Sequence, residues 1–179
     1  KEFEQKVGYV FKDKTLLSSA LTHASRNDKK TNNERLEFLG DRVVGLIMAD
    51  MIYKAFPDEK EGDMALRHAA LVQQSALVEV ADNIGLASVI QASSGDLKQA
   101  GASRDTIVSD AVEALCGAIY LDGGYAAIER LVQSWWKEMV GRYTVPPQDP
   151  KTALQEWAQA RGLSLPQYKV LSQTGSDHA

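Results

Sequence analysis

The stretch from Asn32 to Val44, NNERLEFLGDRVV, constrains the fold most, because it combines acidic residues and a glycine with a helical apolar pattern. An α-helix turns about 100° per residue, so Glu37 and Asp41 lie about 40° apart, with Glu34 about 60° from Glu37. The apolar residues occupy a broad face elsewhere on the helix: Leu36, Leu39, Val43, Leu46 and Ile47. Gly40 costs such a helix roughly 1 kcal/mol relative to alanine. It therefore indicates that another helix, a backbone or an ion lies close.

A second stretch, from Ile107 to Gly124 (IVSDAVEALCGAIYLDGG), repeats this combination. Asp110 and Glu113 are three residues apart and share one helical face, on which Gly117 also falls. Buried carboxylates are costly unless they are paired or bind a metal, and this stretch contains no arginine or lysine. If the two helices cross, their acids converge into an all-oxygen site suited to Mg²⁺ or Mn²⁺ and to phosphate-ester chemistry. The predicted ligands are Glu37, Asp41, Asp110 and Glu113.

Composition sets broad limits on the class of protein. The 179 residues allow one ordinary domain and a small second one. No apolar run approaches the roughly 20 residues of a membrane span, and no signal peptide is visible, so we expect no membrane association. The single cysteine, Cys116, is predicted to be a core residue rather than a nucleophile, and suits a reducing cytoplasm. The net charge of -4 argues only weakly against a nucleic-acid partner, because the predicted metal site contributes four negative charges.

The order of elements predicts a helical domain and a short second module. Residues 2–10 read as a helix, Asp13 as the N-cap of the next, and Pro57 as the end of the acidic helix. Further helices are predicted at 63–72, 75–84 and 125–143, with Gly85 as a C-cap. The proline-rich 144–150 is read as a linker between domains at 1–143 and 151–179. The second contains a predicted helix at 151–160 and a strand at 166–172, too little to bury a core, and is predicted to be cut short.

Four motifs carry a resemblance to a known family. They are LTHAS (21–25), NERLEFLGD (33–41), EGDM (61–64) and DAVEALCGAIYLDGG (110–124). With them the chain resembles the bacterial ribonuclease III family throughout, and its tail, DPKTALQEWAQARGLSLPQYKV, is similar to the opening of a double-stranded-RNA-binding domain. The resemblance implies an all-α, ribonuclease III-type endonuclease domain, followed by the start of an α+β double-stranded-RNA-binding domain.

The same resemblance implies a function. Family members are homodimeric endoribonucleases that cleave double-stranded RNA with divalent metal, Mg²⁺ or possibly Mn²⁺, leaving 5′-phosphate and 3′-hydroxyl ends. Precursors of ribosomal RNA and some mRNAs and tRNAs are the implied substrates. Glu37, Asp110 and Glu113 match the family's metal ligands, and Asp41 and Glu113 match its essential catalytic acids.

Further positions match contact residues of the family. Phe38 matches a residue that fills a pocket on the partner subunit, with an ordinary core phenylalanine as the alternative. Glu34 and Glu61 match acids near the RNA path. The residues that match contacts to the RNA minor groove are Thr152, Gln155, Glu156 and His178.

Two histidines need separate interpretation. His68 stands where the family usually has arginine, and Arg67 precedes it, so we expect this arginine to point elsewhere; His68 itself is either consequential or a neutral surface substitution. His23 is predicted to organise the loop before the acidic helix rather than to act as a catalytic base.

Two other functions remain open at this point. An all-α nucleotide pyrophosphohydrolase could use Glu34 and Glu37 with Asp110 and Glu113, and would act on free nucleotides. A non-catalytic double-stranded-RNA-binding relative would bind duplex without cutting it, although such a relative is expected to lack at least one of the four acids.

Overall fold

The computed structural model describes residues 2–26, 32–93, 102–142, 145–147 and 150–169. The chain divides into two compact units, Lys1–Pro146 and Pro147–Ala179. The described part of the first unit is helical: α1 (Glu2–Val7), α2 (Lys14–Ala20), α3 (Glu34–Ala55), α4 (Glu61–Val72), α5 (Gln74–Ile84), α6 (Ala102–Gly123) and α7 (Tyr125–Arg142), with short 3-10 turns η1 (Ala24–Arg26) and η2 (Leu86–Ser88). The predicted all-α fold of this unit is confirmed.

Local chemistry determines several helix ends. The Asp13 side chain caps α2 by accepting a hydrogen bond from the Thr15 amide at 2.8 Å. Helix α3 ends at Ala55, two residues before Pro57, whose ring cannot continue a helix. Gly85 terminates α5 with a φ of +70°, in the left-handed region that favours glycine. All three of these predicted helix ends are confirmed.

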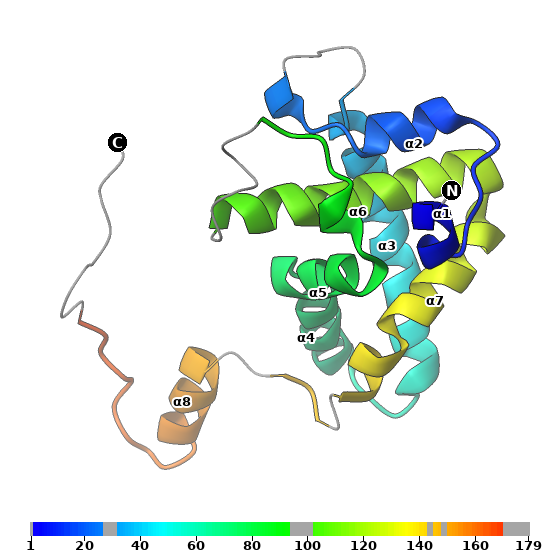
Figure 1. The fold of residues 1–179 in the computed structure, drawn as a ribbon. Helices are drawn as coiled ribbons and strands as arrows, with labels where there is room; N and C mark the ends of the chain where they lie inside the picture. The colour runs from blue at the N-terminus through cyan, green and yellow to red at the C-terminus, as the bar shows by residue number, and fades with distance from the viewer. Residues whose placement is uncertain (1, 27–31, 94–101, 143–144, 148–149, 170–179) are drawn as a thin grey trace. The chain divides into compact units, whose positions relative to one another are not determined.

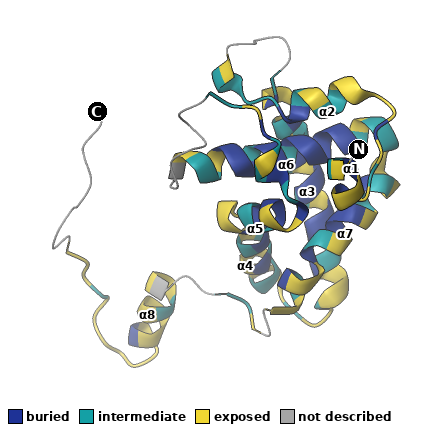
Figure 2. Ribbon diagram, viewed as in Figure 1, coloured by how far each residue is buried: buried dark blue, intermediate teal, exposed yellow. Residues whose placement is uncertain are grey.

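Helix α6 lies at the centre of this unit, with α2, α3, α5 and α7 packed around it (Figure 1). Its most extensive contact is with α3. Most of α6 is buried over its length (Figure 2), which explains why its sequence is apolar on nearly every side. The few acidic residues on α6 are therefore positioned by a rigid and largely desolvated element.

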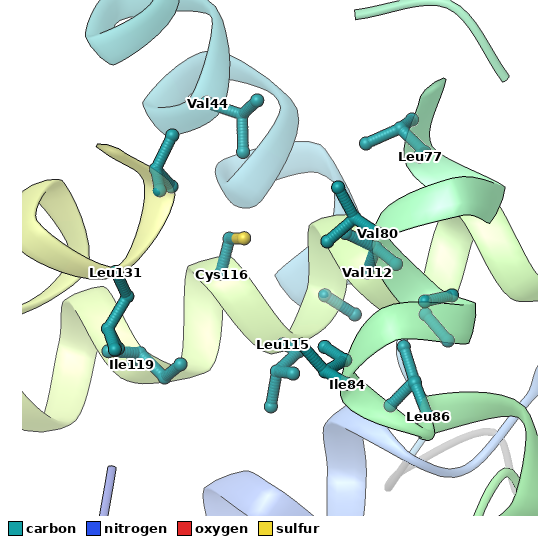
Figure 3. Close-up of a cluster of buried hydrophobic side chains, with 14 of the residues drawn as sticks. Val44, Leu77, Val80, Ile84, Leu86, Val112, Leu115, Cys116, Ile119 and Leu131 are labelled. Carbon is teal, nitrogen blue, oxygen red and sulfur yellow. The ribbon is translucent and has the colours of Figure 1, made fainter. Parts of the chain in front are cut away.

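The core gathers around the middle of α6. Cys116 lies among Val44 of α3, Val80 of α5 and Leu115 of α6 (Figure 3), and is fully buried. Burial raises the pKa of its thiol, so it behaves as a small apolar residue, as predicted. Trp136 is also buried, and its indole N–H donates to the Leu71 carbonyl at 2.8 Å.

The second unit contains helix α8 (Pro150–Gln159). The strand predicted at 166–172 is wrong over its described part, because residues 166–169 form no strand; residues 170–172 lie outside the described residues. A strand needs a neighbouring strand to pair its backbone groups, and the described residues of this unit provide none. Across the described parts of the chain, no helix combines the length and apolarity that crossing a membrane requires.

Candidate metal centre

The candidate centre lies where α3 crosses α6. Gly40 of α3 and Gly117 of α6 are at the crossing, and a β-carbon at either would overlap the backbone of the other helix. The two helices therefore approach more closely than side chains normally allow. This close approach brings the acidic faces of the two helices together.

Three of the four predicted ligands converge at this crossing. Glu37, Asp110 and Glu113 are each half-buried, and one carboxylate oxygen from each lies within 4.8 Å of the others. Asp41 does not belong to this group, and its carboxylate forms an ion pair with the adjacent Arg42. Its charge nevertheless acts on both Glu37 and Glu113. Asp41 therefore lies beside the cluster rather than within it.

The electrostatics of the cluster favour a bound cation. Burial, followed by the negative charges of Asp41, Glu37 and Asp110, raises the pKa of Glu113 to about 8. Burial and then the charge of Asp110 raise the pKa of Glu37 as well. The pKa of Asp110 is also raised by burial, although the charge of His23 and a hydrogen bond with Ser109 oppose this shift. Each carboxylate is thus costly to ionise without a compensating positive charge.

The donor set fits a hard divalent cation. All three groups offer carboxylate oxygen, which is the ligand type that Mg²⁺ and Mn²⁺ prefer. Nitrogen and sulfur ligands, which would favour zinc, do not belong to the cluster found among the described residues. The residues present are therefore suited to Mg²⁺ or Mn²⁺.

Phe38 lies on the surface, which excludes the alternative of a core phenylalanine. Its side chain is 69% exposed, and the Arg42 guanidinium lies 5.6 Å from the centre of its ring. A cavity of about 300 Å³ opens between α3 and α4. It is lined by Ala49, Ile52, Tyr53, Glu61, Met64, Ala65 and His68. Sequence patterns alone do not indicate this cavity, because it depends on how α4 packs against α3.

Arg67 and His68 point in different directions. Arg67 is buried, donates to both carboxylate oxygens of Glu59 at 2.7 and 2.5 Å, and lies 3.6 Å from the centre of the Phe56 ring. The expectation that the Arg67 side chain points in a different direction from the side chain at position 68 is confirmed. His68 is half-buried and lines the cavity, with its Nε2 2.9 Å from the Gly45 carbonyl.

The remaining predicted contact residues are not members of this cluster. Glu34 and Glu61 are exposed at the starts of α3 and α4. Thr152, Gln155 and Glu156 are exposed on α8 in the second unit. His178 lies outside the described residues.

An all-helical unit with a carboxylate cluster suited to Mg²⁺ defines a candidate metal-dependent hydrolase, and comparisons with known proteins specify the family. A family model described as Ribonuclease-III-like matches residues 13–139. The protein named Ribonuclease 3 from Jannaschia sp. (strain CCS1) is 44% identical over 178 residues, which are 99% of this chain and 78% of that protein. Its namesake from Ehrlichia ruminantium (strain Gardel) is 44% identical over 175 residues, or 96% of this chain and 77% of that protein. The chain belongs to the ribonuclease-III-like family.

Solved structures agree with this assignment. The nuclease domain of ribonuclease III from Campylobacter jejuni, in a structure described by the flexibility of a region involved in dimer formation, superposes with a TM-score of 0.72 at 37% identity. The matched region covers 77% of this chain and 96% of the Campylobacter jejuni chain. Dicer from Pichia stipitis has a TM-score of 0.59 over 93% of this chain and 77% of its own, but at 23% identity it supports the fold alone.

Proposed function

We propose that this chain is an endoribonuclease that hydrolyses phosphodiester bonds in double-stranded RNA with divalent cations. The observation that carries this proposal is the convergence of Glu37, Asp110 and Glu113 where α3 crosses α6. Membership of the ribonuclease-III-like family, with relatives named Ribonuclease 3, supports RNA as the substrate. By resemblance, duplex RNA is the form cleaved, and precursors of ribosomal RNA with some mRNAs and tRNAs are the substrates.

The residues of the cluster would hold the cation and control protons near it. When bound, Mg²⁺ or Mn²⁺ makes water a better nucleophile and stabilises charge on the departing oxygen. Glu113 would hold the cation in its ionised form, because its raised pKa of about 8 reflects the cost of a negative charge there without a compensating positive one. The charge of Asp41 acts on Glu113, and the Asp41 carboxylate forms an ion pair with Arg42. Asp41 and Glu113 would be the two catalytic acids that the resemblance implies.

The hydrolysis forms one bond and breaks another. A water oxygen attacks phosphorus, and the bond between phosphorus and the 3′ oxygen breaks. The water proton passes to solvent or to a carboxylate of the site, and the leaving 3′ oxygen takes up a proton. The products therefore carry 5′-phosphate and 3′-hydroxyl ends.

A homodimer through the exposed face of α3 completes the proposal. Phe38, Leu46 and Tyr53 are 69%, 60% and 71% exposed and fall on one face of this helix. Gly45 and Leu46 lie halfway between Phe38 and Tyr53, so two antiparallel copies of α3 related by a two-fold axis there would place Phe38 opposite Tyr53. Tyr53 lines the cavity of about 300 Å³, so this cavity is the proposed site for Phe38 of a second copy.

The second unit would contribute contacts to RNA. Thr152, Gln155 and Glu156 are exposed on α8, where their side chains are available to the minor groove of A-form RNA and its 2′-hydroxyl groups. Cytoplasm is the proposed compartment, because the single cysteine has no internal disulfide partner.

The test is cleavage of a long RNA duplex, with single-stranded RNA of the same sequence as a control. We expect the chain to cut the duplex with Mg²⁺, and to lose cutting when the metal is chelated or when Glu113→Gln is introduced. Duplex binding without cutting would instead support a non-catalytic RNA-binding relative. Hydrolysis of free nucleoside triphosphates with the duplex left intact would support a nucleotide pyrophosphohydrolase.

A further inference from the structure

Arg42 of α3 contacts two side chains of its own chain at once. Its guanidinium forms an ion pair with the carboxylate of Asp41, and the same group lies 5.6 Å from the centre of the Phe38 ring. Phe38 and Arg42 are four residues apart, so they are neighbours on one face of the helix. Asp41, which lies outside the cluster of three acids, is thus linked through Arg42 to the side chain proposed to enter a second copy.

The proposed two-fold axis places Arg42 against the cavity of the second copy. The axis that sets Phe38 opposite Tyr53 also sets Arg42 opposite Ala49, because the two copies of α3 run antiparallel. Tyr53 and Ala49 both line the cavity of about 300 Å³. The guanidinium that lies beside the Phe38 ring would therefore reach the same cavity as the ring.

A carboxylate of complementary charge lines this cavity. Glu61, at the start of α4, is exposed and is one of the lining residues. Among the residues that the structure describes, neither a hydrogen bond nor an ion pair involves its side chain. Asp50, which follows Ala49 on α3, already pairs with Lys54 at 2.6 Å. Glu61 is therefore the carboxylate best able to receive an arginine from a second copy.

We propose that Arg42 is a subunit-contact residue: on association, its guanidinium leaves Asp41 of its own chain and pairs with Glu61 of a second copy. Asp41 and Glu37 are four residues apart on α3, so the released Asp41 carboxylate can turn toward the cluster. Association of two copies thus completes the set of four acids. This inference rests on the proposed function and its dimer, to which it adds a charge pair between the copies and a link between association and the metal centre.

The test of the charge pair is reversal of each charge, with the dimer dissociation constant measured by sedimentation equilibrium without RNA. Arg42→Glu sets two carboxylates against each other at both contacts of a two-fold dimer, and should raise the dissociation constant about 100-fold. Glu61→Arg should do the same with two cations. A mixed dimer of the two variants regains opposite charges at both contacts, so an equimolar mixture should dimerise within about 10-fold of the unsubstituted chain.

Arg130→Glu is the matched control, because it makes the same change in charge at an exposed arginine of α7 rather than of α3 or α4. It should leave the dissociation constant unchanged, and mixing it with Glu61→Arg should restore no mixed dimer. If the mixture of Arg42→Glu and Glu61→Arg forms no mixed dimer, or if Arg130→Glu weakens association as strongly as Arg42→Glu, the inference is overturned.

The link to the metal centre is measured by repeating the sedimentation with Mn²⁺. A cation that draws Asp41 into the cluster favours the state in which Arg42 has left it, so Mn²⁺ should lower the dissociation constant of the unsubstituted chain about 5-fold. In Arg42→Gln, Asp41 has no ion pair to break, and Mn²⁺ should change the dissociation constant by less than about 2-fold. An equal effect of Mn²⁺ on both chains would show that Arg42 does not restrain Asp41.

The failure of this inference is distinguishable from the failure of the proposed function. If the unsubstituted chain is monomeric at every concentration, the proposed dimer fails and this inference fails with it. If Phe38→Ala separates the copies but Arg42→Glu does not, the dimer stands and only the role of Arg42 fails. Cleavage of duplex RNA by the unsubstituted chain tests the proposed activity independently of both results.

Discussion

Gly40 of α3 lies directly against the backbone of Glu113 in α6, so closely that a β-carbon on Gly40 would fall 1.7 Å from the Glu113 carbonyl oxygen. The relationship is reciprocal, because a β-carbon on Gly117 would fall 2.3 Å from the Leu36 carbonyl oxygen. The glycines thus determine how far apart the two helices lie at the point where the acids meet. Gly40, which on its own destabilises α3, is therefore required for the acids of the two helices to meet.

We predict that Gly40→Ala destabilises the fold by about 3 kcal/mol, because backbone rather than a flexible side chain must move to make room. The variant should also bind Mn²⁺ more weakly, since separating α3 from α6 moves Glu37 away from Glu113. Urea denaturation and calorimetry measure the two effects. Gly141→Ala is the control: a β-carbon there meets nothing within 4 Å, so its stability should stay the same or rise by up to about 1 kcal/mol. Equal behaviour of the two variants would contradict the close crossing.

The sequence predicted those features that depend on local chemistry or on helical periodicity. The cap at Asp13, the end of α3 before Pro57 and the left-handed Gly85 each follow from a single residue type. The shared face of Asp110 and Glu113 follows from their spacing on a helix. Gly40 indicated that another helix, a backbone or an ion lies close to it, and its neighbour is the backbone of the helix that carries these acids.

Other features depend on packing and could not be predicted. Helical spacing places Asp41 on the acidic face, but its carboxylate pairs with the adjacent Arg42, a choice of rotamer that periodicity does not determine. The cavity between α3 and α4 depends on the angle at which these helices pack. The strand expected at 166–172 required a partner strand, and the described residues of the second unit contain none.

We predict that Glu113→Gln stabilises the metal-free chain at alkaline pH. The pKa of Glu113 rises from an ordinary value of 4.5 to about 8 on folding, so the unfolded chain ionises this group first. The contribution of the protonated Glu113 to the free energy of unfolding is therefore fully present below pH 4.5. This contribution is lost as the pH rises toward 8. Removing the charge should raise the free energy of unfolding near pH 8 by on the order of 2 kcal/mol and leave it unchanged near pH 4.

Urea denaturation in a chelator, repeated across this pH range, measures the effect. Saturating Mg²⁺ should stabilise the unsubstituted chain near pH 8, and should stabilise Glu113→Gln much less, because the variant lacks one carboxylate ligand. A variant that is less stable than the unsubstituted chain at every pH would contradict the electrostatic cost of this cluster.

We predict that Glu59→Gln costs about 3 kcal/mol, because it removes the carboxylate charge to which the buried Arg67 guanidinium donates two hydrogen bonds. Arg67 has a side-chain exposure of 1%, against 19% for Glu59, so water cannot replace the lost partner. The hydrogen bonds from Arg67 lower the pKa of Glu59, so stability from this pair is present above pH 4.5 and is lost as the pH falls below it.

The Glu79 and Arg142 pair is the control for this prediction, because it has the same two-point geometry, at 2.9 and 2.6 Å, on the surface. Glu79→Gln should cost no more than about 1 kcal/mol, since solvent screens exposed ion pairs. Urea denaturation at neutral pH compares the two variants. Similar costs for both would show that burial of Arg67 contributes nothing to the strength of its pair.

We predict that Phe38→Ala converts the proposed dimer into monomers at concentrations where the unsubstituted chain is dimeric. A two-fold dimer loses the contact twice, which at about 2 kcal/mol for each buried side chain raises the dissociation constant roughly 1000-fold. Ala65→Trp should cause the same defect from the other side, by filling the cavity that Ala65 lines. Sedimentation equilibrium over a concentration series measures both.

Leu121→Ala is the control for this last prediction, because Leu121 is 54% exposed but belongs to α6 and not to the exposed face of α3 that carries Phe38. It should leave the dissociation constant unchanged, since truncating an exposed side chain outside an interface removes no buried area. Phe38→Ala should also keep the unfolding behaviour of a folded monomer, because Phe38 is 69% exposed and contributes little buried area within its own unit. A dimer that survives both Phe38→Ala and Ala65→Trp would show that the two copies associate through a different surface.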